Sequence, residues 1–272
     1  MLLAAGRGER MRPLSDHTPK PMLPVKGKPL MQWTMEAMRR AGVQDLVVNT
    51  AWLGEQIPQH FGSCLDSANE SSSSDRPPMR MHYSHEGADF GEALETAGGI
   101  IRALPFLADV FWVAAGDVWM PDFLFSPEAY DRFHASSQLA HIWLVPNPAH
   151  NLRGDFGVAF DATATGHPDG MAQSAASPRQ GPAPNQGLAL NLPSNSTAPR
   201  WTFSTVALYK KAFFQSAWCD IPAGNPHGVK APLAPMLRAA MDNGLVGATL
   251  YEQAWSDVGT PERLAEINNK PR

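Results

Sequence analysis

The chain has 272 residues, of which 43% are hydrophobic, and it carries a formal net charge of −4. This length suits one large α/β domain or two small ones, and the hydrophobic content excludes a generally disordered protein. The acidic balance argues against a nucleic-acid-binding protein, which typically has a basic excess. The two cysteines, Cys64 and Cys219, lie far apart and form neither a disulfide framework nor a spacing typical of metal sites.

The chain contains no uninterrupted apolar stretch long enough to span a bilayer. Its first five residues are apolar, but glycine and arginine follow at once, which argues against a signal peptide. We therefore expect a cytoplasmic protein that binds neither membranes nor nucleic acid. The sequence patterns leave its oligomeric state open.

Short apolar runs alternate with stretches of helical periodicity along the chain. Strands are predicted at residues 1–5, 46–48, 79–83, 110–115, 139–145, 155–160, 201–209 and 246–251, and helices at residues 30–41, 96–104, 231–243 and 261–268. Such an alternation is typical of βαβ units. We therefore predict a single α/β domain over residues 1–272, with a Rossmann-like, mostly parallel central sheet flanked by helices.

Two stretches break this alternation. Residues 63–78 contain four consecutive serines, Ser71 to Ser74, and residues 162–199 are rich in Pro, Ala, Ser, Asn and Gly with almost no aliphatic period. Such compositions are typical of loops that build no core. We interpret both stretches as flexible insertions, the second of them lying between two strands.

A glycine- and arginine-rich loop follows the first predicted strand directly. Gly6 and Gly8 allow backbone N–H groups to approach phosphate oxygens closely. Arg10 and Arg12 supply positive charge, and Lys20 stands between two prolines that stiffen its segment. The spacing matches neither the Rossmann fingerprint nor a Walker A loop. A Gly-x-Gly alone is more often a plain turn with solvated arginines, but its combination with a strand and three cations favours phosphate binding.

Two aspartates that are far apart in the chain are candidate metal ligands. Asp117 comes after the strand predicted at residues 110–115, at the end of a strand where α/β sheets bind ligands, and Asp257 lies near the C-terminus. Mg²⁺ binds a few carboxylates and completes its shell with water and phosphate oxygens, so the pair could share one nucleotide-bound metal. Each also has an ordinary alternative: Asp117 as a turn residue, and Asp257 or Thr260 as a helix cap.

The segment Leu-Glu-Thr-Ala-Gly-Gly-Ile at residues 94–100 opens a predicted helix. Glycines at a helix N-terminus allow a planar base to approach closely and leave N–H donors free to bind it. The simpler alternative is a capped helix start with Thr96 as the N-cap. The two interpretations are compatible.

Residues 3–14 and 18–25 closely resemble the signature of the sugar-1-phosphate nucleotidyltransferases, and residues 116–117 and 255–260 resemble the metal motifs of that family. The resemblance implies the nucleotidyltransferase form of the Rossmann-like fold. It also implies that Arg10, Lys20 and Asp117 are catalytic and that Asp117 and Asp257 hold Mg²⁺. The nucleotide would lie among Ala4, Ala5, Gly6, Gly8, Arg10, Met11, Lys20, Asn49, Glu95, Gly98, Gly99 and Asp117. Family members usually have a few more residues before the first strand, so we expect a shortened first strand or a start further upstream.

Residues 94–99 are most similar to those uridylyltransferases of the family that act on N-acetylmuramate-1-phosphate and serve cell-wall recycling. Residues 49–54, 147–148, 154–157, 203–204 and 230–238 agree with the same group. The similarity implies UTP as the nucleotide, with Asp155 and Ser204 bonded to sugar hydroxyls and Lys230 meeting the sugar phosphate or the lactyl carboxylate of muramate. As ordinary alternatives, Asp155 could cap a strand and Lys230 could be a solvated residue before a helix.

The implied reaction is the attack of the sugar-1-phosphate oxygen on the α-phosphorus of the NTP, with release of pyrophosphate. Such transfers need positioning and charge stabilisation more than a protein nucleophile. One alternative is a mannose-1-phosphate guanylyltransferase or another hexose-1-phosphate nucleotidyltransferase, since guanylyltransferases have a segment similar to residues 94–99. Another is a non-catalytic nucleotide-sugar sensor on the same fold. The presence of Arg10, Lys20, Asp117 and Asp257 favours an enzyme over a sensor.

Overall fold

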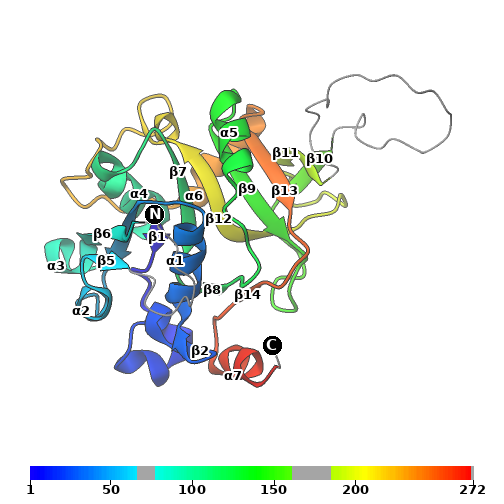
Figure 1. The fold of residues 1–272 in the computed structure, drawn as a ribbon. Coiled ribbons are helices and arrows are strands. Elements are labelled where there is room, and N and C mark those ends of the chain that lie inside the picture. The colour runs from blue at the N-terminus through cyan, green and yellow to red at the C-terminus, as the bar shows by residue number, and fades with distance from the viewer. Residues whose placement is uncertain (66–76, 161–184, 271–272) are drawn as a thin grey trace, which may run out of the picture.

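The computed structural model describes residues 1–65, 77–160 and 185–270. Its centre is a ten-stranded sheet of order β10-β11-β13-β9-β12-β7-β1-β4-β6-β5, which runs across the molecule in Figure 1. The strands of this sheet are β1 (Leu2–Leu3), β4 (Asp45–Thr50), β5 (Cys64–Leu65), β6 (Met79–His85), β7 (Val110–Ala115), β9 (Ala140–Val145), β10 (Gly157–Phe160), β11 (Gln186–Leu190), β12 (Thr202–Lys210) and β13 (Val246–Leu250). Two small sheets accompany it: β2 (Pro24–Val25) pairs with β3 (Lys28–Pro29), and β8 (Val118–Trp119) pairs with β14 (Ser256–Asp257).

Most strands of the large sheet run in one direction, as the sequence predicts. The pairings direct β1, β4, β6, β7, β9, β10 and β13 one way, and β5, β11 and β12 the other. The parallel neighbours β7, β1, β4 and β6 form one half of the sheet, whereas the half from β10 to β12 is mixed. A reversed strand needs no crossover helix to pair with its neighbour, which accounts for the mixed half.

Helices cover both faces of the sheet because its central strands are buried on both sides. The helices are α1 (Leu30–Arg40), α2 (Gln56–Phe61), α3 (Glu86–Phe90), α4 (Glu95–Ala103), α5 (Pro127–Ala135), α6 (Leu233–Asp242) and α7 (Pro261–Asn269). In β7, Trp112 and Ala114 belong to the core cluster that includes α1, while Phe111 and Val113 belong to the cluster that includes α4 and α6. This alternation follows from the two-residue period of a strand.

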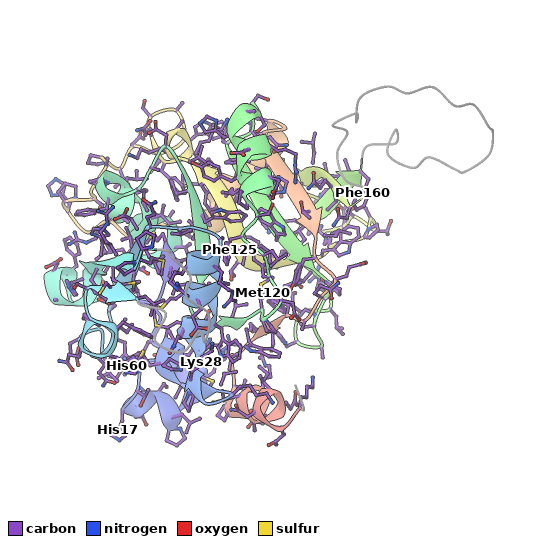
Figure 2. The ribbon with its side chains drawn as sticks, viewed as in Figure 1. His17, Lys28, His60, Met120, Phe125 and Phe160 are labelled. Carbon is purple, nitrogen blue, oxygen red and sulfur yellow. The ribbon has the colours of Figure 1, made fainter. Side chains whose placement is uncertain are left out.

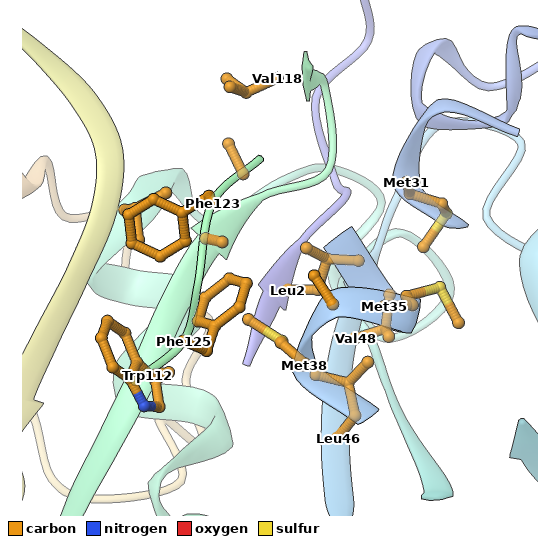
Figure 3. Packing of buried hydrophobic residues seen from close by; sticks show 14 of the residues in the cluster. Leu2, Met31, Met35, Met38, Leu46, Val48, Trp112, Val118, Phe123 and Phe125 are labelled. Carbon is orange, nitrogen blue, oxygen red and sulfur yellow. The ribbon is translucent and has the colours of Figure 1, made fainter. Parts of the chain in front are cut away.

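Figure 3 shows how α1 packs on the sheet. Met31, Met35 and Met38 are fully buried and recur at helical spacing, so they form one apolar stripe. The stripe faces Leu2 of β1 and Leu46 of β4, which lie in the same core cluster. The stripe therefore packs α1 against β1 and β4, two of the strands that end at the candidate site.

The structure describes parts of both predicted insertions, and those parts contain strands. β5 lies in residues 63–78, and β11 lies in residues 162–199, both of which were expected to be flexible insertions. β11 forms because it pairs with β10 on one side and β13 on the other. Residues 66–76 and 161–184 lie outside the described residues, the latter beginning directly after Phe160 at the edge of the molecule in Figure 2.

The other predicted elements agree with the structure to within a few residues, and the short helices α2 and α3, together with α5, were not predicted. The first strand is short, Leu2–Leu3, as expected. Among the described residues, no helix is both long and apolar enough to pass through a membrane.

Candidate active site

A cleft of about 930 Å³ opens where β1, β4 and β7 end. The predicted site residues that line it are Ala4, Ala5, Gly6, Gly8, Arg10, Lys20, Asn49, Glu95, Asp117 and Asp155. The predicted residues outside its lining are Met11, Gly98, Gly99, Ser204, Lys230 and Asp257. Because parallel neighbours end at the same edge of a sheet, residues far apart in the chain converge here.

The phosphate loop (residues 6–12) forms a tight turn directly after β1. Gly8 has a left-handed φ of 66° and precedes the 3₁₀ helix η1 (Glu9–Met11), whose last N–H donates to the Gly8 carbonyl at 2.9 Å. The side chain of Met11 is fully buried and packs with Val258 and Leu264 near the C-terminus. Met11 therefore anchors the loop from behind, while the glycines and Arg10 face the cleft.

We expect Gly8→Ala to lower kcat/KM for the NTP by roughly tenfold. A left-handed conformation costs a non-glycine residue about 1–2 kcal/mol, and about 1.4 kcal/mol corresponds to tenfold. The added Cβ would also lie 2.8 Å from Lys20 Cβ and push that side chain away. Steady-state pyrophosphate release with varied NTP measures the effect.

Gly27→Ala is the matched control for this variant. Gly27 has a φ of 87°, but no atom lies within 4 Å of a Cβ added there. The control should therefore lose some stability and keep its activity. Unchanged kinetics in Gly8→Ala would show that the loop conformation does not matter to nucleotide binding.

Two of the predicted catalytic residues form an ion pair in the wall of the cleft. Lys20 Nζ lies 2.5 Å from Asp117 Oδ2, and the Lys20 side chain is only 10% exposed. Lys20 belongs to the 3₁₀ helix η3 (Lys20–Met22), and Asp117 follows β7 by two residues. The carboxylate neutralises a largely buried ammonium group, which would otherwise be costly. The third predicted catalytic residue, Arg10, is exposed at the cleft.

The structure brings the two predicted metal ligands together through a strand pair. β14 runs antiparallel to β8 with Asp257 opposite Val118, and the N–H of Val258 donates to the Asp117 carbonyl at 3.0 Å. Figure 1 shows β8 and β14 side by side below the large sheet. The backbones of Asp117, directly before β8, and Asp257, in β14, therefore lie close together although the two residues are far apart in the sequence.

The carboxylate of Asp257 is held by two basic side chains. Arg263 Nη1 lies 2.5 Å from Asp257 Oδ1, and His150 Nε2 lies 3.1 Å from the same oxygen. Arg263 is itself placed by the start of α7, where Thr260 Oγ1 accepts its backbone N–H. Thr260 is therefore the N-cap of α7, as one alternative proposed, whereas the Asp257 side chain does not cap the helix and contacts Arg263 and His150.

The donor set at β8 and β14 fits a magnesium ion. Mg²⁺ takes one or two protein carboxylates and keeps its other positions for water and substrate phosphates. Asp117 and Asp257 supply two carboxylates, and the described part of the chain contains no group of three or more His, Cys, Asp or Glu residues arranged to hold a metal. The pair therefore suits a metal that arrives with phosphates and does not suit a closed structural site.

The predicted base-binding segment differs from expectation in one respect. The N–H groups of Ala97 and Gly98 both donate to the carbonyl of Ala231, at 3.0 and 3.1 Å. These donors at the start of α4 are therefore not free to bind a base. Thr96 does not cap the helix either, since it lies inside α4 and makes no side-chain cap bond. Within this segment, Glu95 and Thr96 line the cleft, whereas Gly98 is buried beneath residues 229–231.

Glu86 is a cleft residue that the sequence analysis missed. It is fully buried, and its two oxygens accept hydrogen bonds from Asn49 Nδ2 at 2.7 Å and from the Leu94 N–H at 2.8 Å. Asn49 Oδ1 in turn accepts the N–H of Ala4 at 2.8 Å. Burial raises the pKa of the Glu86 carboxyl above its usual value. Through Asn49, the Glu86 side chain links Ala4, just before the phosphate loop, to Leu94 at the start of the base segment.

Gly99 explains why this network can form. A Cβ added there would lie 2.5 Å from Glu86 Oε1 and 2.9 Å from Asn49 Nδ2. Gly99 lies outside the cleft lining and has a packing role, since its missing side chain makes room for the buried carboxylate. No local signal marks Glu86 in the sequence, because its two hydrogen-bond partners, Asn49 and Leu94, come from separate segments.

The three predicted sugar residues make side-chain contacts within the protein. Asp155 lines the cleft, but its Oδ2 accepts the Phe203 N–H at 2.8 Å, as expected for a residue that fixes a strand. Ser204 is fully buried and its Oγ accepts the Val206 N–H. Lys230 pairs with Glu92 at 2.5 Å on the exposed side, so it does not reach the cleft.

Arg238 lines the same part of the cleft and was not singled out from the sequence. Its guanidinium lies over the ring of Phe156, 5.1 Å from the centroid, and its Nη1 donates to Asn191 Oδ1 at 2.8 Å. It was overlooked because Asn191 follows β11, in the stretch that was taken for an insertion.

Comparisons with known proteins identify the family of the chain. The family model for nucleotidyl transferases matches residues 1–171. An N-acetylmuramate alpha-1-phosphate uridylyltransferase from Neisseria meningitidis serogroup B is 38% identical over 272 residues, covering 98% of this chain and 95% of that protein.

Two solved structures share the fold at low sequence identity. A Bacillus anthracis protein named as a glucose-1-phosphate thymidylyltransferase matches with a TM-score of 0.64 at 15% identity, covering 98% of this chain and 92% of the other. HddC from Yersinia pseudotuberculosis, complexed with GMP-PN, matches with a TM-score of 0.58 at 16% identity, covering 98% and 96%. These two likenesses support the fold, and the family rests on the sequence matches. The chain therefore belongs to the nucleotidyl transferase family, the sugar-1-phosphate nucleotidyltransferases that its sequence resembles.

Proposed function

We propose that this protein transfers a uridylyl group from UTP to N-acetylmuramate-1-phosphate, forming a nucleotide sugar and releasing pyrophosphate. The choice of substrates is supported by the Neisseria relative, whose match spans nearly the whole of both chains. The observation that supports the chemistry is the pairing of β8 with β14, which brings the backbone of Asp117, directly before β8, close to that of Asp257 in β14. A reaction that consumes UTP belongs in the compartment that supplies nucleotides, so we place the protein in the cytoplasm.

In this proposal the chain acts by positioning and by stabilising charge. Amides of the loop at Gly6 and Gly8, together with Arg10, bind the β- and γ-phosphates and stabilise the charge of the departing pyrophosphate. Lys20 orients the sugar phosphate toward the α-phosphorus. Asp117 and Asp257 would hold a Mg²⁺ ion, which would supply positive charge near the phosphate oxygens.

The network around Glu86 has a separate task in the same reaction. It fixes the Ala4 amide through Asn49 and fixes the Leu94 amide directly, so it sets the distance between the loop and the base segment. The base then lies against Glu95 and Thr96, the members of that segment that line the cleft. No step requires a nucleophile from the protein.

A substrate panel tests the proposal. Pyrophosphate release would be measured with UTP, GTP, dTTP, CTP and ATP, each paired with the 1-phosphates of N-acetylmuramate, N-acetylglucosamine, glucose and mannose in the presence of Mg²⁺. We expect selective turnover of UTP with N-acetylmuramate-1-phosphate. Selective turnover of GTP with mannose-1-phosphate would agree with the family but contradict the proposed substrates, UTP and N-acetylmuramate-1-phosphate. Folded protein that binds a nucleotide and turns over no pair would instead be a sensor.

A further inference from the structure

Arg238 is a cleft cation without a carboxylate partner among the described residues. Around the cleft, Lys20 pairs with Asp117, Arg263 with Asp257, and Lys230 with Glu92. Arg238 instead donates one N–H to an amide oxygen, that of Asn191. Its side chain is only partly buried and faces the cleft, so the other guanidinium donors remain available there.

Two neighbours hold the guanidinium in a fixed orientation. The ring of Phe156 lies against one of its faces, and Asn191 accepts from one end. Asn191 is itself fixed, because its Nδ2 donates to both oxygens of Asp242, at 3.0 and 3.1 Å. An arginine that is oriented in this way loses little entropy when it binds a planar anion.

Arg238 lies in a different part of the cleft from the phosphate loop. Its partners Phe156 and Asn191 flank β10 and β11, at one end of the ten-stranded sheet, whereas the phosphate loop follows β1 near the middle. The phosphates of the nucleotide are bound by the loop, Lys20 and Arg10 in the proposed function. Arg238 is therefore a cleft cation separate from those of the phosphate loop, and its neighbour Phe156 adjoins Asp155 and packs with Phe203, which also line the cleft.

N-acetylmuramate-1-phosphate carries one anion besides its phosphate, the carboxylate of its lactyl ether. A guanidinium binds a carboxylate through two parallel N–H···O bonds, which is the strongest common arrangement for this pair. We propose that Arg238 binds the lactyl carboxylate and thereby distinguishes the muramyl substrate from N-acetylglucosamine-1-phosphate, which lacks the lactyl group. The assignment rests on the proposed function, since it requires a muramyl sugar as substrate.

The test compares two sugar phosphates in one variant. Arg238→Met removes the charge and keeps a side chain of similar length. With UTP saturating, we expect kcat/KM for N-acetylmuramate-1-phosphate to fall by about 10- to 100-fold, as charge-assisted hydrogen bonds are lost. We expect kcat/KM for N-acetylglucosamine-1-phosphate and KM for UTP to change by less than about threefold, within the usual effect of a surface substitution. Arg238→Lys should show an intermediate loss, because it keeps the charge without the planar fork.

Two further variants complete the design. Arg132→Met on α5, outside the cleft lining, controls for loss of an arginine, and Lys230→Met tests the cation that the sequence pointed to. An equal fall for both sugars in Arg238→Met, or a selective fall in Lys230→Met alone, would overturn the assignment. If the unaltered protein turns over other sugar phosphates and not the muramyl one, the proposed function is wrong. The lactyl-carboxylate subsite at Arg238 is then wrong as well. Turnover of the muramyl substrate that Arg238→Met leaves unchanged overturns the subsite alone.

Discussion

Asp117→Asn should lower kcat by about 10²- to 10³-fold, the cost usually found when one preorganised electrostatic group is removed from an active site. The substitution keeps the shape of the side chain and removes its charge. That charge neutralises Lys20 at 2.5 Å and, in the proposed function, binds Mg²⁺ together with Asp257. Pyrophosphate release at saturating UTP, sugar phosphate and Mg²⁺ measures the effect.

Asp122→Asn is the matched control, because Asp122 is an exposed aspartate a few residues further along the same segment. It should keep full activity. Circular dichroism of Asp117→Asn should match that of the unaltered protein, since the backbone bond from Val258 to the Asp117 carbonyl does not involve the side chain. A thermal scan should show a modest loss of stability, as Lys20 loses its partner. Full turnover by folded Asp117→Asn would rule out its proposed place in the metal site.

Glu86→Gln should lower kcat/KM for UTP by about 10- to 100-fold, which corresponds to the 1–3 kcal/mol cost of a buried donor left without an acceptor. Both partners of Glu86, the Asn49 amide and the Leu94 N–H, are donors. A carboxylate accepts from both, whereas glutamine has one acceptor and must turn its own NH₂ toward one of them. Rotating Asn49 does not help, because its oxygen is needed by the Ala4 N–H.

A double variant separates this positioning role from general damage. In Asn49→Asp with Glu86→Gln, the new carboxylate can accept from Ala4 and from the glutamine NH₂, while the glutamine oxygen accepts from Leu94. Every donor then has an acceptor again, so we expect the double variant to recover much of the kcat/KM lost by Glu86→Gln. Equal losses in the single and double variants would contradict a role through hydrogen-bond polarity.

The same residue gives the protein a pH-dependent stability. Burial raises the pKa of Glu86 above its ordinary value of 4.5. The folded protein therefore binds this proton more tightly than the unfolded chain does, and the stability that the group contributes falls as pH rises from 4.5 through the raised pKa. Urea unfolding across this range should show the unaltered protein losing free energy of unfolding relative to Glu86→Gln as pH increases. The opposite trend would contradict the buried carboxyl.

The glycine- and arginine-rich loop and the two candidate metal aspartates could be singled out from the sequence because their signals are local. Gly6 and Gly8 follow an apolar run, and Lys20 stands between two prolines, so each carries its chemistry within a short stretch. The two aspartates were matched by motif, but the closeness of their backbones depends on the pairing of β8 with β14. Hydrophobic periodicity in the sequence does not predict this pairing. Gly6, Gly8, Arg10 and Asp117 line the cleft, whereas Asp257 lies outside its lining.

The base and sugar ends of the cleft depend on contacts between distant segments, and there the sequence was less informative. The free donors expected at the start of α4 are taken by Ala231, which lies more than a hundred residues further on. Ser204 and Lys230 are polar residues at suitable places in the chain, yet burial and an ion pair with Glu92 remove them from the cleft. Residue type and spacing do not contain this information.

The elements that were missed have a similar cause. β11 reads Gln-Gly-Leu-Ala-Leu within a stretch rich in proline and asparagine, and its strand conformation is imposed by β10 and β13 on either side. Its position bears on the proposed Arg238 subsite, because Asn191 follows β11 directly and accepts a hydrogen bond from Arg238. The shortest helices, α2 and α3, lack enough turns to show a clear apolar period.

The most direct test of the account is ³¹P NMR of the purified protein mixed with UTP, N-acetylmuramate-1-phosphate and Mg²⁺. The account predicts that the UTP and sugar-phosphate signals decline together while a nucleotide-sugar diphosphate and an equal amount of pyrophosphate appear. Phosphorus signals that stay unchanged with this pair, while a different nucleotide and sugar phosphate react in the same protein, would contradict it.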